Sequence, residues 1–177
     1  RLKPNFAEAY YELGVMYNKK DLVDEAIVQF EKTLKFFPEF ASAHFNLGIA
    51  YGAKGLLDKA IPHLKEAIRI NPFNAVSHYV LASAYMEKGL LDEAIREFRK
   101  AMMINPSNVV AHSGLANAYL EKGLSDRAII HFKIVKKNKP DATETYFGLG
   151  MAYKNEAEKV NSVSQKKELY EKALDEL

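Results

Sequence analysis

Five of the six prolines in this chain recur at a constant interval of 34 residues. They are Pro4, Pro38, Pro72, Pro106 and Pro140, and Pro62 alone falls outside the series. On that interval whole columns agree across five copies: Leu13, Leu47, Leu81, Leu115 and Leu149, then Tyr17, Tyr51, Tyr85, Tyr119 and Tyr153. A repeat of this period restricts the fold to a stack of similar small units, because one unit alone cannot bury its apolar face.

Each repeat contains two amphipathic segments with helical spacing. In the third copy Leu81, Ala82 and Tyr85 recur at intervals of three and four residues, and Ala94 and Phe98 repeat that spacing after a break. The break is a Lys-Gly pair, found at 54–55, 88–89 and 122–123. Glycine adopts the left-handed conformation that closes a helix, so the sequence predicts two helices per repeat joined by a tight turn.

The ends of the second helix are also marked. An aspartate follows each turn, and we predict that it caps the helix by accepting hydrogen bonds from unpaired N–H groups: Asp24, Asp58, Asp92 and Asp126. The helix should end before the next proline, which has no N–H to donate. Gly14, Gly48 and Gly150 stand inside the first helices. Glycine costs about 1 kcal/mol there relative to alanine, so we expect the paired helix to approach closely at these positions.

This order of residues, Leu-Gly, Tyr, Ala, Phe, Ala and Pro at fixed spacings, resembles the tetratricopeptide repeat. The match runs from Ala7 to the end of the chain. The resemblance implies an all-α fold in which antiparallel helix pairs stack into a right-handed superhelical solenoid, with the first helix of each pair lining a concave groove. The expected repeats within one continuous domain are 7–40, 41–74, 75–108, 109–142 and an atypical 143–177 with lengthened helices, after residues 1–6 from the end of a preceding repeat.

The fifth repeat lacks the Lys-Gly turn. We predict a longer first helix and a second helix that starts at a capping box, Ser162 to Gln165, and runs to Leu177. No polar capping helix follows, so we expect either a piece of a longer protein or an end face that docks onto another copy. The chain begins at Arg1, already inside the repeat pattern, so we expect its native N-terminus to be missing. A cytoplasmic location is favoured and a periplasmic one stays open.

Charge and motif content exclude several classes of function. The 25 Lys and Arg nearly balance the 23 Asp and Glu, which predicts no nucleic-acid partner. The longest uncharged run, residues 101–120, contains a proline and several polar residues, so we predict no membrane insertion. The absence of cysteine removes thiolate metal sites and cysteine nucleophiles. His44, His78 and His112 share one column, but they belong to different helices and are too far apart to hold one ion. No catalytic motif is found, so we predict a protein that is not an enzyme and needs no cofactor or metal.

What remains is a stripe on the first helices that should be polar if it only faced solvent, yet is largely apolar. We predict that it is a groove that binds a peptide or an amphipathic helix of another protein. The candidate groove residues are Tyr11, Val15, Phe45, Asn46, Ile49, Val76, Tyr79, Ser83, Ser113, Asn117, Phe147 and Met151. Some of these are expected to pack against the neighbouring repeat instead.

Two known uses of the family do not fit. The clamp for the C-terminal carboxylate of chaperone tails needs lysine, arginine and asparagine where this chain has Tyr11, Val15, Val76 and Val80, so only Asn46 matches. The asparagine ladder of the O-linked sugar transferase is absent from the Asn46 column. Two alternatives to a peptide-binding scaffold stay open: a substrate-recruiting region of a larger enzyme, and a self-assembling platform joined through the C-terminal helix.

Overall fold

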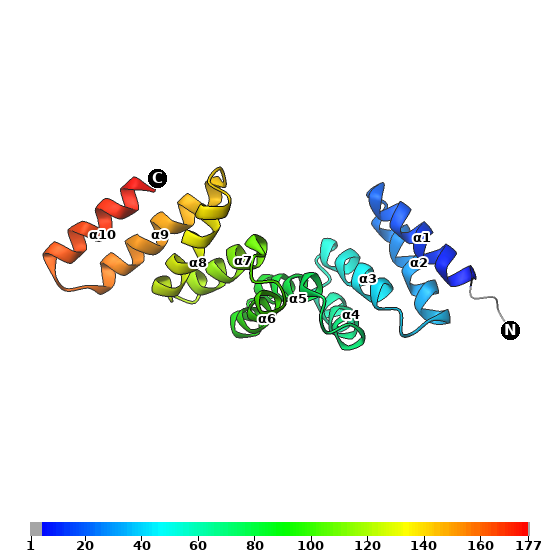
Figure 1. Ribbon diagram of the computed structural model, residues 1–177. Coiled ribbons are helices and arrows are strands. Elements are labelled where there is room, and N and C mark those ends of the chain that lie inside the picture. The colour runs from blue at the N-terminus through cyan, green and yellow to red at the C-terminus, as the bar shows by residue number, and fades with distance from the viewer. Residues whose placement is uncertain (1–4, 177) are drawn as a thin grey trace. The chain divides into compact units, whose positions relative to one another are not determined.

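The computed structural model describes residues 5–176 (Figure 1). Within that range the chain forms ten α-helices and no strand, which confirms the predicted all-α fold. The helices are α1 (Asn5–Lys19), α2 (Val23–Phe36), α3 (Ala41–Ala53), α4 (Leu57–Ile70), α5 (Ala75–Glu87), α6 (Leu91–Ile104), α7 (Val109–Glu121), α8 (Ser125–Asn138), α9 (Thr143–Lys159) and α10 (Val163–Asp175). Pro4, and with it most of the expected preceding repeat, lies outside the described residues.

The chain divides into two compact units, residues 1–88 with α1 to α5 and residues 89–177 with α6 to α10. In the first unit each helix packs against the next one along the chain, and α3 also contacts α1 and α5. In the second unit the same neighbour packing continues from α6 to α10, and α7 also contacts α9. Within each unit, therefore, the first helices of successive pairs lie side by side.

The turns inside the pairs follow the sequence. Gly55, Gly89 and Gly123 have φ angles of 71°, 74° and 75°, which confirms the predicted left-handed turns. In the first pair Asp21 occupies the same position with a φ of 60°. Aspartate is one of the few residues other than glycine that visit this conformation, so the turn is kept at some cost in backbone strain.

The prediction that aspartates cap the second helices is wrong. The N-cap positions are leucines without a side-chain cap, for example Leu56 of α4, and Asp58 lies within the first turn. The carboxylates instead form ion pairs with the lysine of the next Lys-Gly turn, thirty residues on: Asp24 with Lys54, Asp58 with Lys88, and Asp92 with Lys122. Attraction to that lysine, which the sequence of one repeat does not contain, decides where each side chain points.

Side-chain caps are found at the first helices of two pairs, α5 and α7, and at α10. Asn74 accepts from the backbone N–H of Val76 at 3.0 Å, and Asn108 accepts from that of Ala111 at 3.1 Å. Ser162 accepts from the N–H of Gln165 at 3.5 Å, as the predicted capping box requires. α9 has 17 residues and α10 has 13, so only the first helix of the last pair is lengthened. α10 ends at Asp175 rather than Leu177, which lies outside the described residues.

The core lies between successive helix pairs. Leu47, Ala50 and Tyr51 of α3 are buried against Ala26, Ile27 and Phe30 of α2. Leu81, Leu115 and Leu149, in the matching column, are also buried, but Leu13 is 37% exposed. Residues 5–176 contain no helix before α1 that could cover Leu13.

Glycine allows close helix packing at Gly14 and Gly48, two of the three positions where it was predicted. A Cβ atom added at Gly48 would lie 2.7 Å from Cγ of Leu64, and one at Gly14 would lie 2.6 Å from Cε1 of Phe30. Both distances are too short for a real contact, so a side chain at either position would push α3 from α4, or α1 from α2. The first helices are thereby held close to their partners, and their opposite faces are left at the surface.

Candidate functional site

The twelve predicted groove residues all lie on α1, α3, α5, α7 and α9, and each is at least partly exposed. Phe147 is 62% exposed and Val76 is 44% exposed. Exposure of large apolar side chains to water is unfavourable, so covering them with a ligand would lower the free energy. The structure brings some of the twelve together around cavities and ties others to the core.

Three of the predicted residues line one cavity of about 270 Å³ between α3, α4 and α5. Ile49, Tyr79 and Ser83 contribute to its wall together with Gly52 and Glu87, and we call it the Gly52 pocket. Val80 and Ala84 of α5 and Leu57, Ala60 and Leu64 of α4 complete the lining with Gly48. Its surface is mostly apolar and Glu87 is its sole charged residue.

Residue 52 leaves its part of the cavity wall open because it has no side chain. A Cβ added at Gly52 would have no heavy atom within 4 Å, whereas the residues one and two repeats later are Met86 and Leu120. Gly52 was not among the candidate residues predicted from the sequence. The signal for Gly52 was present in the 34-residue alignment, as the smallest residue in a column of longer ones.

A smaller cavity of about 60 Å³ lies at the other end of α3. Phe45 and Ser42 line it with Asn71, Asn74 and Ser77. The Asn74 side-chain oxygen already accepts from two backbone N–H groups as the cap of α5. This cavity is therefore a small polar site beside an aromatic ring, and its asparagine is held in a fixed orientation.

Tyr11, Val15 and Asn46 belong more to the scaffold than to a free surface. Tyr11 and Val15 pack, half-buried, against the core between α2 and α3. The side-chain amide of Asn46 donates to the Tyr11 hydroxyl at 3.0 Å, and the Tyr11 ring lies 4.9 Å from that of Phe40. The expected packing against a neighbouring repeat applies to these residues.

In the second unit Phe147 and Met151 line a cavity of about 390 Å³ between α9 and α10. Tyr170 and Leu174 of α10 form its opposite wall, and Lys154 is its one charged residue, so we call it the Lys154 cavity. Gly150 and Ala173 complete the lining. Val76, Ser113 and Asn117 line none of these three cavities.

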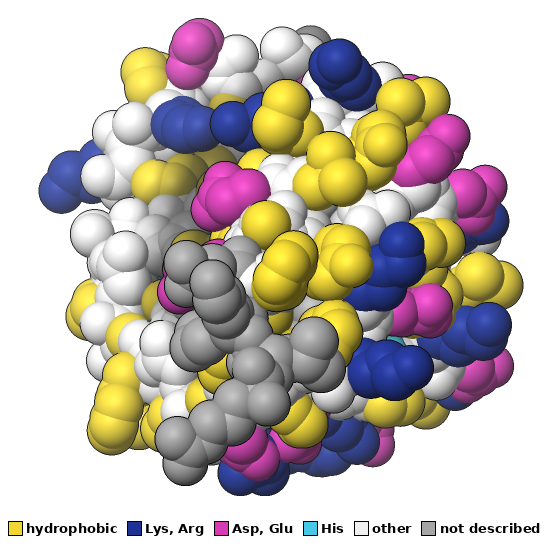
Figure 2. Space-filling model, turned by 90° about the vertical axis from the view of Figure 1, so that its right-hand side faces the viewer, with side chains coloured by type: hydrophobic (Ala, Val, Ile, Leu, Met, Phe, Trp, Pro, Cys, Tyr) yellow, Lys and Arg dark blue, Asp and Glu magenta, His cyan; other side chains and the backbone are white. Residues whose placement is uncertain are grey.

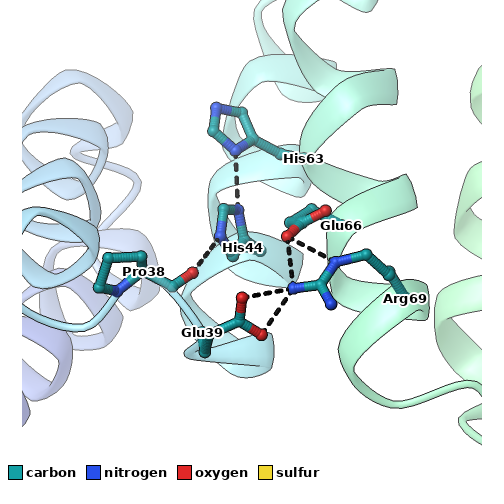
Figure 3. Close-up of polar contacts among 6 residues, drawn as sticks. All are labelled: Pro38, Glu39, His44, His63, Glu66 and Arg69. Carbon is teal, nitrogen blue, oxygen red and sulfur yellow. Dashed lines mark hydrogen bonds and ion pairs between the residues drawn. The ribbon is translucent and has the colours of Figure 1, made fainter.

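A cluster of polar side chains fixes α3 and α4 to the turn before them (Figure 3). His44 Nε2 donates to the carbonyl of Pro38 at 2.8 Å, and His44 Nδ1 lies 3.0 Å from Nδ1 of His63. A carbonyl can only accept, so the His44 proton is on Nε2 and, in the neutral pair, His63 donates between the Nδ1 atoms. Arg69 joins Glu39 at 2.6 Å and Glu66 at 2.8 Å in the same cluster.

The same histidine arrangement recurs in the second unit. His112 Nε2 lies 3.0 Å from the Pro106 carbonyl, and His112 Nδ1 lies 3.0 Å from that of His131. His78 and Tyr146 make the matching contact to Pro72 and Pro140. This column thus ties α3, α5, α7 and α9 to the turns before them.

Burial affects the titration of this cluster. Burial lowers the pKa of His63 and that of His131, and the partner histidine lowers each pKa further. The Tyr51 ring stacks on His63, and its hydroxyl donates to Glu31 at 2.6 Å. Burial and that hydrogen bond raise the pKa of Tyr51 to about 12.

Charge is spread over the surface. Figure 2 shows apolar, basic and acidic side chains interspersed on the face that it displays, with neither sign gathered into one patch. Among residues 5–176, no group of three or more histidine, aspartate or glutamate side chains is placed to hold a metal ion. No helix in the described part of the chain is both long and apolar enough to span a membrane.

Models of the tetratricopeptide repeat match residues 7–40 and 41–74, and a TPR repeat model matches residues 82–123. A comparison with curated protein sequences finds no match.

Several solved structures share the fold. A crystal structure of MamA protein is 25% identical with a TM-score of 0.86, and the match covers 98% of this chain and 93% of that one. A second MamA crystal structure is 27% identical with a TM-score of 0.80, covering 93% and 94%. YrrB, described as a TPR protein with an unusual peptide-binding site, is 20% identical with a TM-score of 0.79, covering 94% and 84%.

Proposed function

The chain belongs to the tetratricopeptide repeat family, and from that membership we propose that it is a non-catalytic protein-interaction module. Its ligand is a peptide or an amphipathic helix of a partner protein, held on the exposed faces of the first helices. The proposed contacts are the groove residues named from the sequence, except Tyr11, Val15 and Asn46, which pack within the repeats.

The observation that carries this proposal is the Gly52 pocket beside exposed apolar side chains. Ile49, Tyr79 and Ser83, chosen because they break the polar pattern expected of a solvated helix, line one cavity. A cavity of about 270 Å³ is smaller than the roughly 300–1,000 Å³ typical of small-molecule sites. One side chain of a longer ligand suits that volume better than a cofactor does.

The surroundings of the pocket also favour a polypeptide. Phe45 lines the neighbouring polar cavity on the same helix, α3, three to four residues before Gly48 and Ile49. An extended segment or a helix lying along α3 could contact both cavities at once, as peptides do in grooves lined by helices. YrrB, whose fold the chain shares, is a protein with a peptide-binding site, which supports this type of ligand.

The test is selection of binders from a random twelve-residue peptide library displayed on phage, with the chain as bait. Enriched peptides are then measured by fluorescence polarisation. The double variant Phe45→Ala and Tyr79→Ala should weaken binding at least tenfold with the helical content unchanged. Phe73→Ala is the matched control, since Phe73 is 81% exposed in a turn outside the first helices. Selection of no peptide, or of peptides that the double variant binds equally well, contradicts the proposal.

A second candidate function, self-association, is favoured by α10. Leu174 is 71% exposed and lines the Lys154 cavity with Tyr170 and Phe147. If another copy covers this surface, light scattering over a concentration series should show a mass above that of one chain. Leu174→Lys should restore a monomer. Met103→Lys, a control on α6 at a residue that is 82% exposed, should not. A monomer at every concentration contradicts this candidate.

A further inference from the structure

We propose that the Gly52 pocket receives one apolar side chain of the bound peptide, and that a lysine or arginine next to that side chain in the peptide pairs with Glu87. The inference rests on the proposed function, because it takes the ligand to be a polypeptide. It goes further by assigning the anchor residue and the charge beside it.

The lining of the pocket selects an apolar side chain. Ile49, Val80 and Leu57 line the cavity from three helices, and the small residues Gly48, Gly52 and Ala60 complete its wall. The hydroxyl of Ser83 donates to the carbonyl of Tyr79 at 3.1 Å, so its proton is already used. A polar side chain inserted here would lose its hydrogen bonds to water and gain few in return, whereas an aliphatic one gains by leaving water.

The charge beside the pocket selects a cation. Glu87 is exposed at the end of α5 and is the one charged residue in the lining. Its neighbour Lys88 is engaged by Asp58 across the turn. Within residues 5–176, Glu87 takes part in no ion pair. A lysine or arginine of the ligand would therefore find a carboxylate without a competing partner, which fixes the direction of the ligand more than its affinity.

The geometry of residue 52 supplies a variant that blocks the pocket without harming the fold. Gly52 lines the cavity and a Cβ there meets no neighbour within 4 Å. Gly52→Met, which copies the residue one repeat later, should place a side chain over the opening while it removes a helix-weakening glycine. Gly52→Ala is the matched control, since it makes the same backbone change and leaves the opening clear.

The test uses isotope-labelled full chain and three probes: N-acetyl-leucyl-lysine amide, N-acetyl-leucyl-glutamate amide and N-acetyl-alanyl-lysine amide. Binding is read from NMR shifts of the Gly52 amide, or the residue 52 amide in variants, and of the Ile49 methyl groups. The leucyl-lysine probe should give saturable shifts, the leucyl-glutamate probe should bind at least threefold more weakly, and the alanyl-lysine probe should give none. Gly52→Met should abolish binding, Gly52→Ala should retain it, and Glu87→Gln should remove the preference for lysine.

Equal binding of the lysine and glutamate probes, absence of saturable binding, or binding that survives Gly52→Met overturns the inference. The phage selection separates this failure from failure of the proposed function. Peptides that depend on Phe45 and Tyr79 but ignore Gly52→Met would leave the module a peptide binder with another anchor. If the selection yields no such peptide, the proposed function itself fails.

Discussion

The Gly52 pocket and the Lys154 cavity are built at the same place in two repeats and differ in charge. Gly48, Ile49 and Gly52 of α3 correspond, three repeats later, to Gly150, Met151 and Lys154 of α9. Both cavities are lined mainly by apolar side chains, but the one charged residue is Glu87 in the first and Lys154 in the second. The helix-pair scaffold thus sets where a cavity forms, while one or two residues around it set what it attracts.

The largest effect should come from the scaffold that the two sites share. Tyr85 and Tyr153 are each 7% exposed, and a lysine lies over each ring, at 5.8 Å for Lys65 and 5.7 Å for Lys133. Replacing either by alanine should lower the free energy of unfolding by roughly 3–5 kcal/mol through the cavity it leaves. Chemical denaturation measures this. A loss below about 1 kcal/mol at one site alone would break the comparison.

A smaller effect separates the two glycines of the Gly52 pocket. Gly48→Leu should cost about 1–3 kcal/mol by overpacking, because Leu64 lies where the new side chain must go. Gly52→Leu should leave stability equal or slightly higher, since nothing lies near its Cβ. Melting temperatures of the two variants, measured side by side, provide the check. Equal melting temperatures would mean that the close approach of α3 and α4 is not what requires glycine at position 48.

Exchanging the charges should sharpen the contrast in selectivity. Glu87→Lys should reverse the preference of the Gly52 pocket, so that the leucyl-glutamate probe binds up to about fivefold better than the leucyl-lysine probe, as expected for an exposed ion pair. Titration by NMR at low ionic strength is the measurement, and added salt should reduce the effect. Lys154→Glu, in the other unit, should leave the Gly52 pocket unchanged.

The two histidine pairs predict how stability depends on pH. The pKa values of His63 and His131 are lowered in the fold, mainly by burial. At pH values between those lowered pKa values and the ordinary pKa near 6.5, the unfolded chain binds more protons than the folded chain. The free energy of unfolding should therefore fall as the pH drops below about 6.5. Nearby Glu31 and Glu66 raise the pKa of His63 and so partly oppose the effect of burial, whereas no acidic side chain raises the pKa of His131. His131→Gln should therefore flatten the pH dependence of the melting temperature more than His63→Gln does, and equal slopes would refute this difference.

The smallest expected effect concerns the turn in the first pair. Asp21→Gly should raise stability by about 1 kcal/mol or less, since the left-handed conformation costs most L-residues about 1–2 kcal/mol and aspartate somewhat less. The reverse change, Gly55→Asp, should lower stability by a similar amount. Thermal denaturation of both variants tests whether the turns of successive pairs are interchangeable.

The repeats, the turns and the helix order could be predicted from sequence because each rests on residues that recur at one spacing. The error at Asp58 came from reading one repeat alone, since its partner Lys88 belongs to the next. Leu13 is exposed because burial of that column depends on a preceding helix pair that the described residues lack. Periodicity carries no information on contacts that differ at the edge of the array.

The candidate site was predicted less completely, for a physical reason. Ile49, Tyr79 and Ser83 were found because apolar or small residues stood on a face expected to be charged. Gly52 was missed because a residue without a side chain gives no apolar or polar signal on a helix face. The cavity that Gly52 lines also depends on Leu57 and Leu64 of a different helix, α4. Asn46 was predicted to contact the ligand, but its side-chain amide already donates a hydrogen bond to the hydroxyl of Tyr11. Neither fact can be read from one helix face.

The ion pairs between aspartates and the lysines thirty residues later bear on how arrays of this kind change length. Duplicating or deleting a whole repeat of this type keeps an aspartate and a lysine thirty residues apart, so the altered array would form the same ion pairs between neighbouring repeats. A change of length inside a repeat puts the aspartate and the lysine out of register. Thirty residues after Asp126 the chain has Glu156 in place of lysine, and Lys159 instead donates to the Gly123 carbonyl at 2.9 Å. Adding complete repeats therefore preserves these ion pairs, whereas an insertion of part of a repeat removes an ion pair that other contacts must replace.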